Sequence, residues 1–237
     1  MTEFSNFQDT FSAPFGIKLR YGGYPELGGI DKFGYLPTAT TSYKTVWDGD
    51  NVYTYPSSAV AMTATSASGA TDNGVEVTIQ GLDTNYAELT ETVTLAGSGT
   101  ATTSGEFLRV FRAYVSNGTA SVGNITIANG GTTYAKIFAE MQQTLMAVYT
   151  IPAGKRGYLI SGNLSVEKNQ PVVAKLMTRQ FGGVLRVSGL VTSFGVPFQR
   201  VWQLPPVLDS KTDIEIRAKA GATTSIAAGF EIILEDK

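Results

Sequence analysis

Two pairs of acidic residues stand close enough together in the sequence to suggest acid–base chemistry. Glu88 and Glu91 form one pair, and Asp213 and Glu215 form the other. Two carboxylates can hydrolyse a glycosidic bond when a groove holds them at a suitable separation. In the segment DIEIRAKA, however, Asp213 and Glu215 would share one face of a strand and isoleucines the other, as in an ordinary half-exposed strand. We therefore expect that pair to be solvated and assign no catalytic residue.

A third pair, Asp48 and Asp50 in the segment WDGDN, could belong to an oxygen-rich calcium loop. Counted from Asp48, the fifth, sixth and twelfth positions of such a loop would be Val52, Tyr53 and Ala59. An EF-hand needs an oxygen ligand, a glycine and a glutamate at those positions. The pattern fails, so we predict a hairpin turn and no metal site.

The residue types that most often carry catalysis are missing. The chain contains no His and no Cys. Most catalytic triads, thiolate nucleophiles and zinc sites are therefore excluded, and no disulfide can form. We predict that the protein is not an enzyme and uses no cofactor.

Positive charge points to no particular ligand. The net charge is −2 and no polybasic run occurs, which argues against nucleic acid and membrane as partners. Gly182 and Gly183 match a phosphate loop only loosely, and we expect a hairpin turn there. Some isolated basic residues could contact an acidic partner, although such residues are usually solvated. They are Lys155, Arg156, Arg179 and Arg186.

The N-terminal segment MTEFSNFQDTFSAPFG lacks the basic and apolar regions of a secretion signal. No window approaches the roughly 20 apolar residues of a membrane span. We therefore expect synthesis and assembly in the cytoplasm.

The composition and the frequent turn-forming residues indicate an all-β protein. Only 16% of the residues are charged, against roughly 25% in typical globular domains, and 26 residues are Gly. Short apolar or alternating runs recur between Gly, Pro, Asn, Asp and Ser, which is typical of strands and turns. These runs lie at 43–47, 52–55, 59–65, 75–80, 88–95, 107–115, 124–128, 157–168, 171–180, 184–191, 200–208, 213–220 and 225–234. In the run at 88–95, Glu91 has the inward parity of Leu89 and Val93, so we expect it near a rim or beside a partner.

We expect two β-sandwich or jelly-roll-like lobes, at residues 37–135 and 136–237. The junction between them is ambiguous, because Ile137, Met141, Leu145 and Val148 recur with helical spacing. The segment closes on LMAVYTIPAG, however, which is typical of a strand that runs into a turn. We favour two strands joined near residues 142–143, with a short helix as the alternative.

Residues 1–36 form an irregular N-terminal arm in this interpretation, because Gly and Pro interrupt the segment too often for a long element. A solvated tail would rarely hold so many aromatic residues. Two hypotheses stay open: a loop that packs on its own domain, and an arm that docks on a neighbouring subunit. The candidate interaction residues are Phe11, Phe15, Tyr21, Tyr24, Phe33 and Tyr35.

The segments VEVTIQGLDTNYAELTETVTLAGSG and FLRVFRAYVSNGTASVGNITIA resemble virion structural proteins of tailed bacteriophages. The similar features are the GLD turn, the ETVTL-x-G and F-x-R-V strands and the GT-x-x-VGNI-x-I hairpin. The later LMAVYTIPAGKRGYL resembles the start of the second part of such proteins. The resemblance covers residues 75–160 approximately. It implies an accessory protein of the head, neck or tail that is assembled in the host cytoplasm, and it supplies no catalytic residues.

The leading hypothesis is thus a non-enzymatic virion component, a homo-oligomer and by resemblance a trimer, that binds other virion structural proteins. The alternative is a host-recognition or carbohydrate-binding module of a tail fibre or tip. The candidate sugar platform is Trp47 beside Asp48 and Asn51, whereas Trp202 in VWQLPP looks more like packing. A glycan hydrolase is the third hypothesis, and the sequence offers no convincing carboxylate pair for it.

Overall fold

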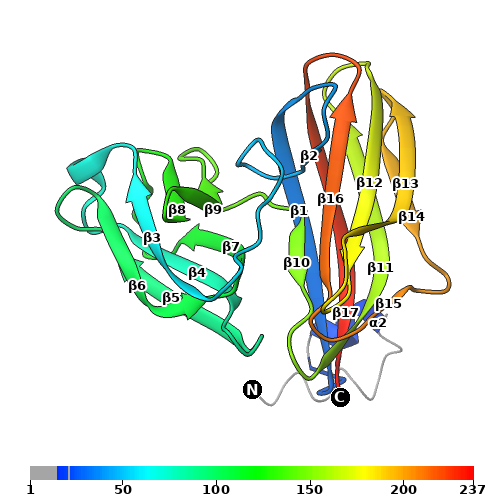
Figure 1. Cartoon of the computed structure of the whole chain (residues 1–237), viewed down its shortest axis with the longest axis horizontal. Coiled ribbons are helices and arrows are strands. Elements are labelled where there is room, and N and C mark those ends of the chain that lie inside the picture. Colours follow the sequence, from blue (N-terminus) through cyan, green and yellow to red (C-terminus); the bar gives the residue numbers. More distant parts are fainter. Residues whose placement is uncertain (1–14, 21) are drawn as a thin grey trace.

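The computed structural model describes residues 15–20 and 22–237. In this part of the chain the regular elements are antiparallel strands, apart from the helix α2 (Phe15–Arg20) and the 3-10 turn η1 (Gly69–Asp72). The all-β class predicted from the sequence is therefore confirmed. The strands form two lobes, which lie side by side in Figure 1.

The lobe on the right of Figure 1, here called the sandwich lobe, consists of two sheets. The first has the order β1-β17-β11-β14, with β15 beside β11, and the second has the order β10-β16-β12-β13, with β2 beside β16. The strands are β1 (Leu27–Ala39), β2 (Lys44–Thr45), β10 (Val148–Thr150), β11 (Lys155–Val166), β12 (Pro171–Arg179), β13 (Arg186–Phe194), β14 (Phe198–Val201), β15 (Val207–Leu208), β16 (Asp213–Ala220) and β17 (Thr224–Asp236).

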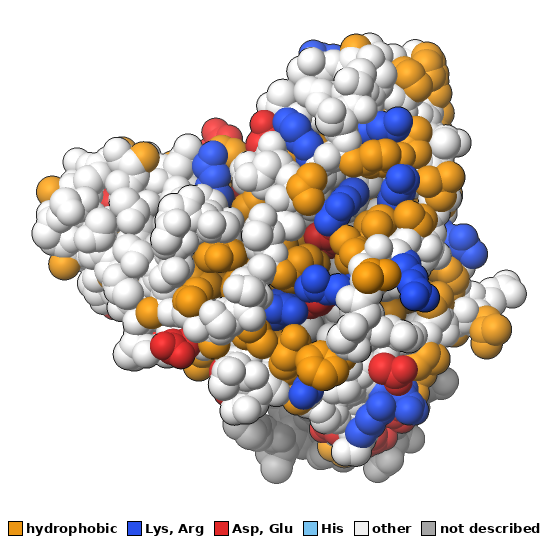
Figure 2. Space-filling model, viewed as in Figure 1, with side chains coloured by type: hydrophobic (Ala, Val, Ile, Leu, Met, Phe, Trp, Pro, Cys, Tyr) orange, Lys and Arg blue, Asp and Glu red, His pale blue; other side chains and the backbone are white. Residues whose placement is uncertain are grey.

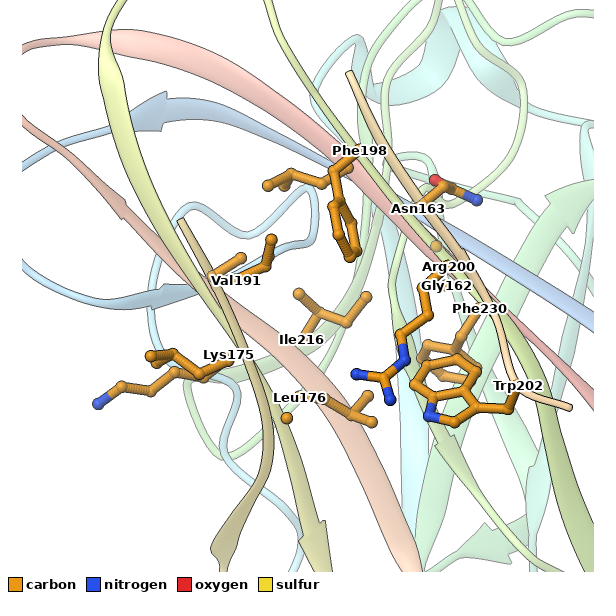
Figure 3. A pocket seen from close by; sticks show the side chains of 15 residues that line it. Gly162, Asn163, Lys175, Leu176, Val191, Phe198, Arg200, Trp202, Ile216 and Phe230 are labelled. Atoms are coloured by element: carbon orange, nitrogen blue, oxygen red, sulfur yellow. The ribbon is translucent and has the colours of Figure 1, made fainter. Parts of the chain in front are cut away.

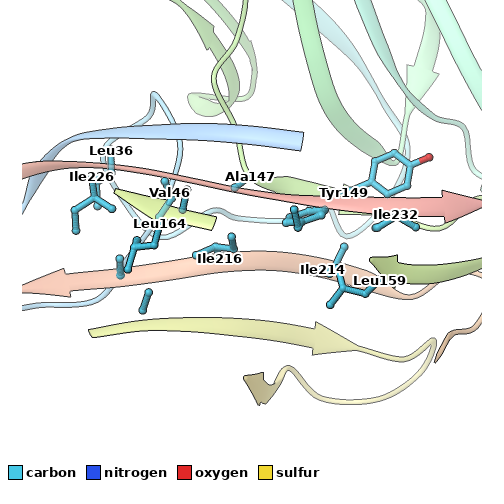
Figure 4. Packing of buried hydrophobic residues seen from close by; sticks show 14 of the residues in the cluster. Leu36, Val46, Ala147, Tyr149, Leu159, Leu164, Ile214, Ile216, Ile226 and Ile232 are labelled. Atoms are coloured by element: carbon cyan, nitrogen blue, oxygen red, sulfur yellow. The ribbon is translucent and has the colours of Figure 1, made fainter. Parts of the chain in front are cut away.

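The core of the sandwich lobe lies between these two sheets (Figure 4). On β17 the buried side chains alternate along the strand, at Ile226, Ala228, Phe230, Ile232 and Leu234. This period of two turns one face of β17 toward the second sheet. Burying each large apolar side chain stabilises the fold by roughly 1.5–3 kcal/mol.

The lobe on the left of Figure 1, here called the inserted lobe, is also built from two sheets. Their orders are β6-β3-β8-β9 and β5-β4-β7, and a second apolar core fills the space between them. The strands are β3 (Val60–Ser66), β4 (Glu76–Leu82), β5 (Glu88–Thr94), β6 (Thr100–Phe107), β7 (Arg109–Val115), β8 (Ile125–Asn129) and β9 (Thr132–Ile137).

The described chain starts in the sandwich lobe, leaves it after Val46 and returns at Ala147. Strand β1 pairs with β17 along nearly its whole length, and its Leu36 is fully buried in the sandwich core. The expected irregular arm is therefore wrong from Leu27 onward, because pairing with the last strand satisfies a backbone that lacks a clear pattern of its own. The predicted lobe boundaries, 37–135 and 136–237, likewise place residues 37–46 with the wrong sheets. That each lobe is an independent domain stays a prediction.

The two crossings pass close together over β1. The Val46 carbonyl accepts a hydrogen bond from the Ala147 amide at 2.9 Å, and Trp47 forms an isolated bridge with Met146. A Cβ at Gly34 of β1 would lie 2.2 Å from the Val46 oxygen and 2.4 Å from the Ala147 nitrogen. Only a residue without a side chain leaves room for this approach.

Most strand predictions in the interior of the sequence are confirmed, with three corrections. The run at 52–55 is not a strand, and β6 at 100–107 was missed because its TATTSGEF sequence has few apolar residues. The run at 200–208 is not one strand, because irregular backbone separates β14 from β15. In the ambiguous segment the described backbone holds strands β9 and β10 and no helix, with a left-handed turn residue at Gln142. The interpretation as two strands is confirmed there.

Candidate interaction surface

Large exposed apolar side chains concentrate on the outer edge of the sandwich lobe. This edge, here called the apolar edge, consists of β13, β14 and the turns beside them. Strand β13 pairs only with β12, and β14 pairs only with β11, so each ends its sheet. Figure 2 shows hydrophobic side chains with Lys and Arg among them on this side, whereas the visible face of the inserted lobe is mostly uncharged and polar. The exposed apolar residues are Phe181, Val184, Val187, Leu190, Phe194, Val196, Val201, Leu204 and Val207.

A small apolar groove opens where β13 and β14 part. Its cavity volume is about 70 Å³, and Leu176, Val191, Phe198 and Trp202 form its walls (Figure 3). The Arg200 guanidinium lies 5.0 Å from the centre of the Trp202 ring. The groove reaches the sandwich core, because Ile216 and Phe230 of that core also line it.

Soluble monomers rarely expose contiguous apolar patches this rich in large side chains, and free sheet edges attract further strands. The apolar edge thus has two properties of a protein–protein interface: uncovered apolar area and unpaired backbone. It is the strongest candidate surface in the described part of the chain.

Among the six aromatic residues predicted to interact, the three whose side chains the structure describes do not lie at this edge. Phe11 and Tyr21 lie outside the described residues, and Phe15 begins α2. Tyr24 precedes β1 and is half-buried, whereas Phe33 and Tyr35 lie on β1 itself. Phe33 is 47% exposed and Tyr35 is half-buried. Their role in binding stays a prediction.

Asp213 and Glu215 are buried, which corrects the expectation that they are solvated. Asp213 is 2% exposed and Glu215 is fully buried. The inserted lobe covers the face of β16 that an isolated sandwich would leave in water. Alternation along a strand identifies the two faces, but it cannot tell that a second lobe covers the polar one.

Asp213 ties the two lobes together through Arg109 of β7. The guanidinium donates from Nε to one carboxylate oxygen at 2.8 Å and from Nη2 to the other at 3.3 Å. Thr150 and Arg179 also donate to Asp213. The hydroxyl of Tyr55, from the inserted lobe, donates to Glu215 at 3.3 Å. Burial raises the pKa of Glu215, although Arg217 beside it opposes the shift.

Lys32 makes a second link between the lobes. Its ammonium group donates a hydrogen bond to the carbonyl of Phe111. The register between β4 and β7 is irregular at this point, so that Phe111 is paired with no residue of β4. Burial, reinforced by the nearby charge of Arg112, lowers the pKa of Lys32 to about 7. The link therefore places an ionisable group in a buried contact.

The segment WDGDN forms a turn at the crossing between the lobes. Asp50 pairs with Lys44 at 3.0 Å, whereas Asp48 is buried and accepts from the Leu145 amide. Burial raises the pKa of Asp48 to about 7. The two carboxylates thus have separate partners and do not converge on a common ligand.

Trp47 cannot serve as an exposed sugar platform. It is 1% exposed, its indole N–H donates to the Asn51 carbonyl at 2.9 Å, and its ring packs edge-on against Tyr53. Trp202 is half-buried and both packs on the core and lines the groove, so the expectation of packing describes part of its role.

Glu91 does have a partner, as its inward parity predicted. Its carboxylate accepts from the backbone amides of Ser104 at 2.7 Å and Gly105 at 2.8 Å. Burial acts to raise the pKa of Glu91, but these hydrogen bonds hold it below its usual value. Glu88 is exposed on the same strand, so a shared proton-transfer role finds no support in their surroundings.

Among the described residues, no helix is long and apolar enough to cross a membrane. The same residues contain no group of three or more Asp or Glu placed to hold a metal ion.

Comparison with known proteins gives little to identify the chain. No family model matches the sequence, and no curated protein matches it. Weak structural similarity links it to proteins of infectious bursal disease virus. The structure of the Gt strain matches with 13% identity and a TM-score of 0.26, over 94% of this chain and 78% of the other. The VP2 subviral particle matches with 12% identity and a TM-score of 0.24, over 88% and 72%. TM-scores this low carry no argument about fold or function.

Proposed function

We propose that the protein is a non-enzymatic structural component of a virion that acts through protein–protein contacts. The apolar edge on β13 and β14 is the observation that carries this proposal. The sequence resemblance adds the finer assignment to a tailed phage, as a capsid decoration protein or as a neck or tail accessory protein. On this proposal the chain is assembled in the host cytoplasm and resides in the particle.

The partner that we assign to the apolar edge is a second copy of the chain. A free edge strand can pair with a neighbouring strand, and burying exposed side chains such as Leu190 and Leu204 stabilises such a pairing. The proposed homo-oligomer is a trimer. Other virion structural proteins would then contact the surfaces that this association leaves free.

The test compares the mass of the particle-free protein with that of a double variant, Leu190→Asp with Leu204→Asp, by light scattering after size exclusion. Leu190 is 62% exposed and Leu204 is 89% exposed, so neither change disturbs the core. The wild type is expected at three times the 25.2 kDa of one chain, and the variant at a lower mass.

The control is Met141→Asp, which places the same charge on an exposed apolar residue of the inserted lobe. This variant should keep the mass of the wild type. A wild type that is monomeric at all concentrations would contradict the assignment of a second copy to the apolar edge.

A carbohydrate-binding or host-recognition role is the second candidate. The observation that favours it is the groove, which is lined by the Trp202 ring, flanked by Arg200, and at its other end by Asn163 (Figure 3). Aromatic rings beside amide groups are suited to sugars. Binding to an array of glycans that is lost in Trp202→Ala would favour this role over self-association.

A further inference from the structure

A cavity of about 400 Å³ lies between the two lobes, away from the apolar groove. The inserted lobe contributes Tyr55, Tyr86 and Arg109 to its walls. The sandwich lobe contributes Lys211 of the turn before β16, and Arg179 through Gly183 at the turn between β12 and β13. That turn is the hairpin expected at Gly182 and Gly183.

Positive charge exceeds negative charge on the walls of this cavity. Arg109, Arg179 and Lys211 carry three positive charges there, and Asp213 is the carboxylate among the wall residues. Asp213 already serves both arginines. Lys211 has no carboxylate within ion-pair distance among the described residues.

Aromatic rings hold these cations in place without neutralising them. The Lys211 ammonium lies 5.2 Å from the centre of the Tyr86 ring and 4.9 Å from that of Phe181. The guanidinium groups of Arg109 and Arg179 lie 5.1 Å and 4.6 Å from the centre of the Tyr55 ring. Such contacts attract the cation to the face of the ring and leave the net charge unchanged.

Two wall residues have a backbone conformation that disfavours side chains. Tyr86 has φ of 63° and Lys211 has φ of 66°, and neither is a glycine. Residues with large side chains rarely adopt this conformation, and those that do are often found at functional sites. Here the conformation brings the Tyr86 ring and the Lys211 ammonium to the same cavity from opposite lobes.

We propose that this cavity is a binding site for an oxyanion, a carboxylate or a phosphate group. The bound group would lie beside Lys211 and the outer side of Arg179, where guanidinium and ammonium groups donate to anionic oxygens. The rings of Tyr86 and Phe181 would shield this ion pair from water and strengthen it. The site shares Phe181 with the apolar edge, but it does not require the proposed self-association.

The test is an NMR titration of the ¹⁵N-labelled protein at constant ionic strength, following the amides of Gly182, Gly183 and Lys211. One arm uses inorganic phosphate and the other uses N-acetylglutamate. Saturable shifts are expected in at least one arm. Saturation by phosphate alone would identify a phosphate site, and saturation by both would show that a carboxylate suffices.

The informative variant is Lys211→Asn. Asparagine tolerates positive φ, so the variant should fold with an unchanged or higher melting temperature, yet it should bind at least tenfold more weakly. Lys168→Asn is the control, because Lys168 is exposed and remote from the cavity walls, and it should bind as the wild type does. Shifts that never saturate, or equal binding by Lys211→Asn, would overturn the proposal.

Discussion

Asp213 is the residue on which the junction between the lobes most depends. Substitution by Asn would leave the buried Arg109 without its carboxylate, and removing one member of a buried ion pair destabilises by about 3–5 kcal/mol. Urea unfolding of Asp213→Asn should show a loss of this size. The matched control is Asp209→Asn, since the Asp209 side chain is 59% exposed in its pairs with Arg156 and Lys237. That control should cost about 0–1 kcal/mol; equal losses in both variants would contradict the role of burial.

Lys32 gives the free energy of unfolding a dependence on pH. Its pKa falls from 10.5 to about 7 on folding, so between these values the unfolded chain holds a proton that the folded protein has released. Stability should therefore rise with pH through this window and be lost as the pH falls toward 7, by about 1.4 kcal/mol per unit at most.

Lys32→Met should remove this rise, which denaturant unfolding at pH 7 to 9.5 would measure. Lys168→Met is the control, because that lysine is exposed, and it should keep the wild-type slope. A variant at Lys32 that retains the full slope would show that another group causes it.

At the scale of the elements, Gly34 of β1 lets the two segments that connect the lobes pass close to the backbone of this strand. Gly34→Ala would force a methyl group against the Val46 carbonyl and the Ala147 amide, both backbone atoms that cannot move aside. We expect a loss of about 1–3 kcal/mol or more in thermal unfolding. Gly28→Ala in the same strand meets nothing closer than 4.0 Å and should change stability little. If the two variants have the same melting temperature, the backbone at the crossing is packed less closely than the structure indicates.

The sequence predicts an element well where one face of a strand is apolar and the other faces water. Strand β5 follows this rule, because Val93 is buried, whereas Thr90, Thr92 and Thr94 on the other face are exposed. Strand β1 could not be predicted, since its Gly and Pro residues weaken any pattern and its pairing partner lies at the other end of the chain. The apolar edge could not be predicted for a similar reason. The run at 184–191 indicates a strand, but whether its side chains are exposed depends on which strand ends the sheet.

At the scale of the whole molecule, the N-terminal region divides into two parts that should respond differently to truncation. Removing residues 1–14 should leave both lobes folded and weaken assembly, if the aromatic residues of that segment dock on a neighbour. Removing residues 1–36 should unfold the sandwich lobe, because it deletes most of β1 and the buried Leu36. Circular dichroism melts and light scattering would separate these outcomes. Normal assembly after the first truncation would contradict the docking arm.

The pairing of β1 with β17 also sets how the protein would respond to a mechanical load. These antiparallel strands bring residue 27 opposite residue 235, so both ends of the described chain emerge at the same end of the sandwich (Figure 1). A force that pulls the two ends apart would break the hydrogen bonds between β1 and β17 one after another, from Leu27 onward. The force would not act on all of these hydrogen bonds at once, as it does when strands are pulled along their length in opposite directions. The chain of the inserted lobe leaves the sandwich lobe after Val46 and returns at Ala147. Peeling of β1 would therefore break the link from Lys32 to Phe111 before it reached the crossing at Gly34.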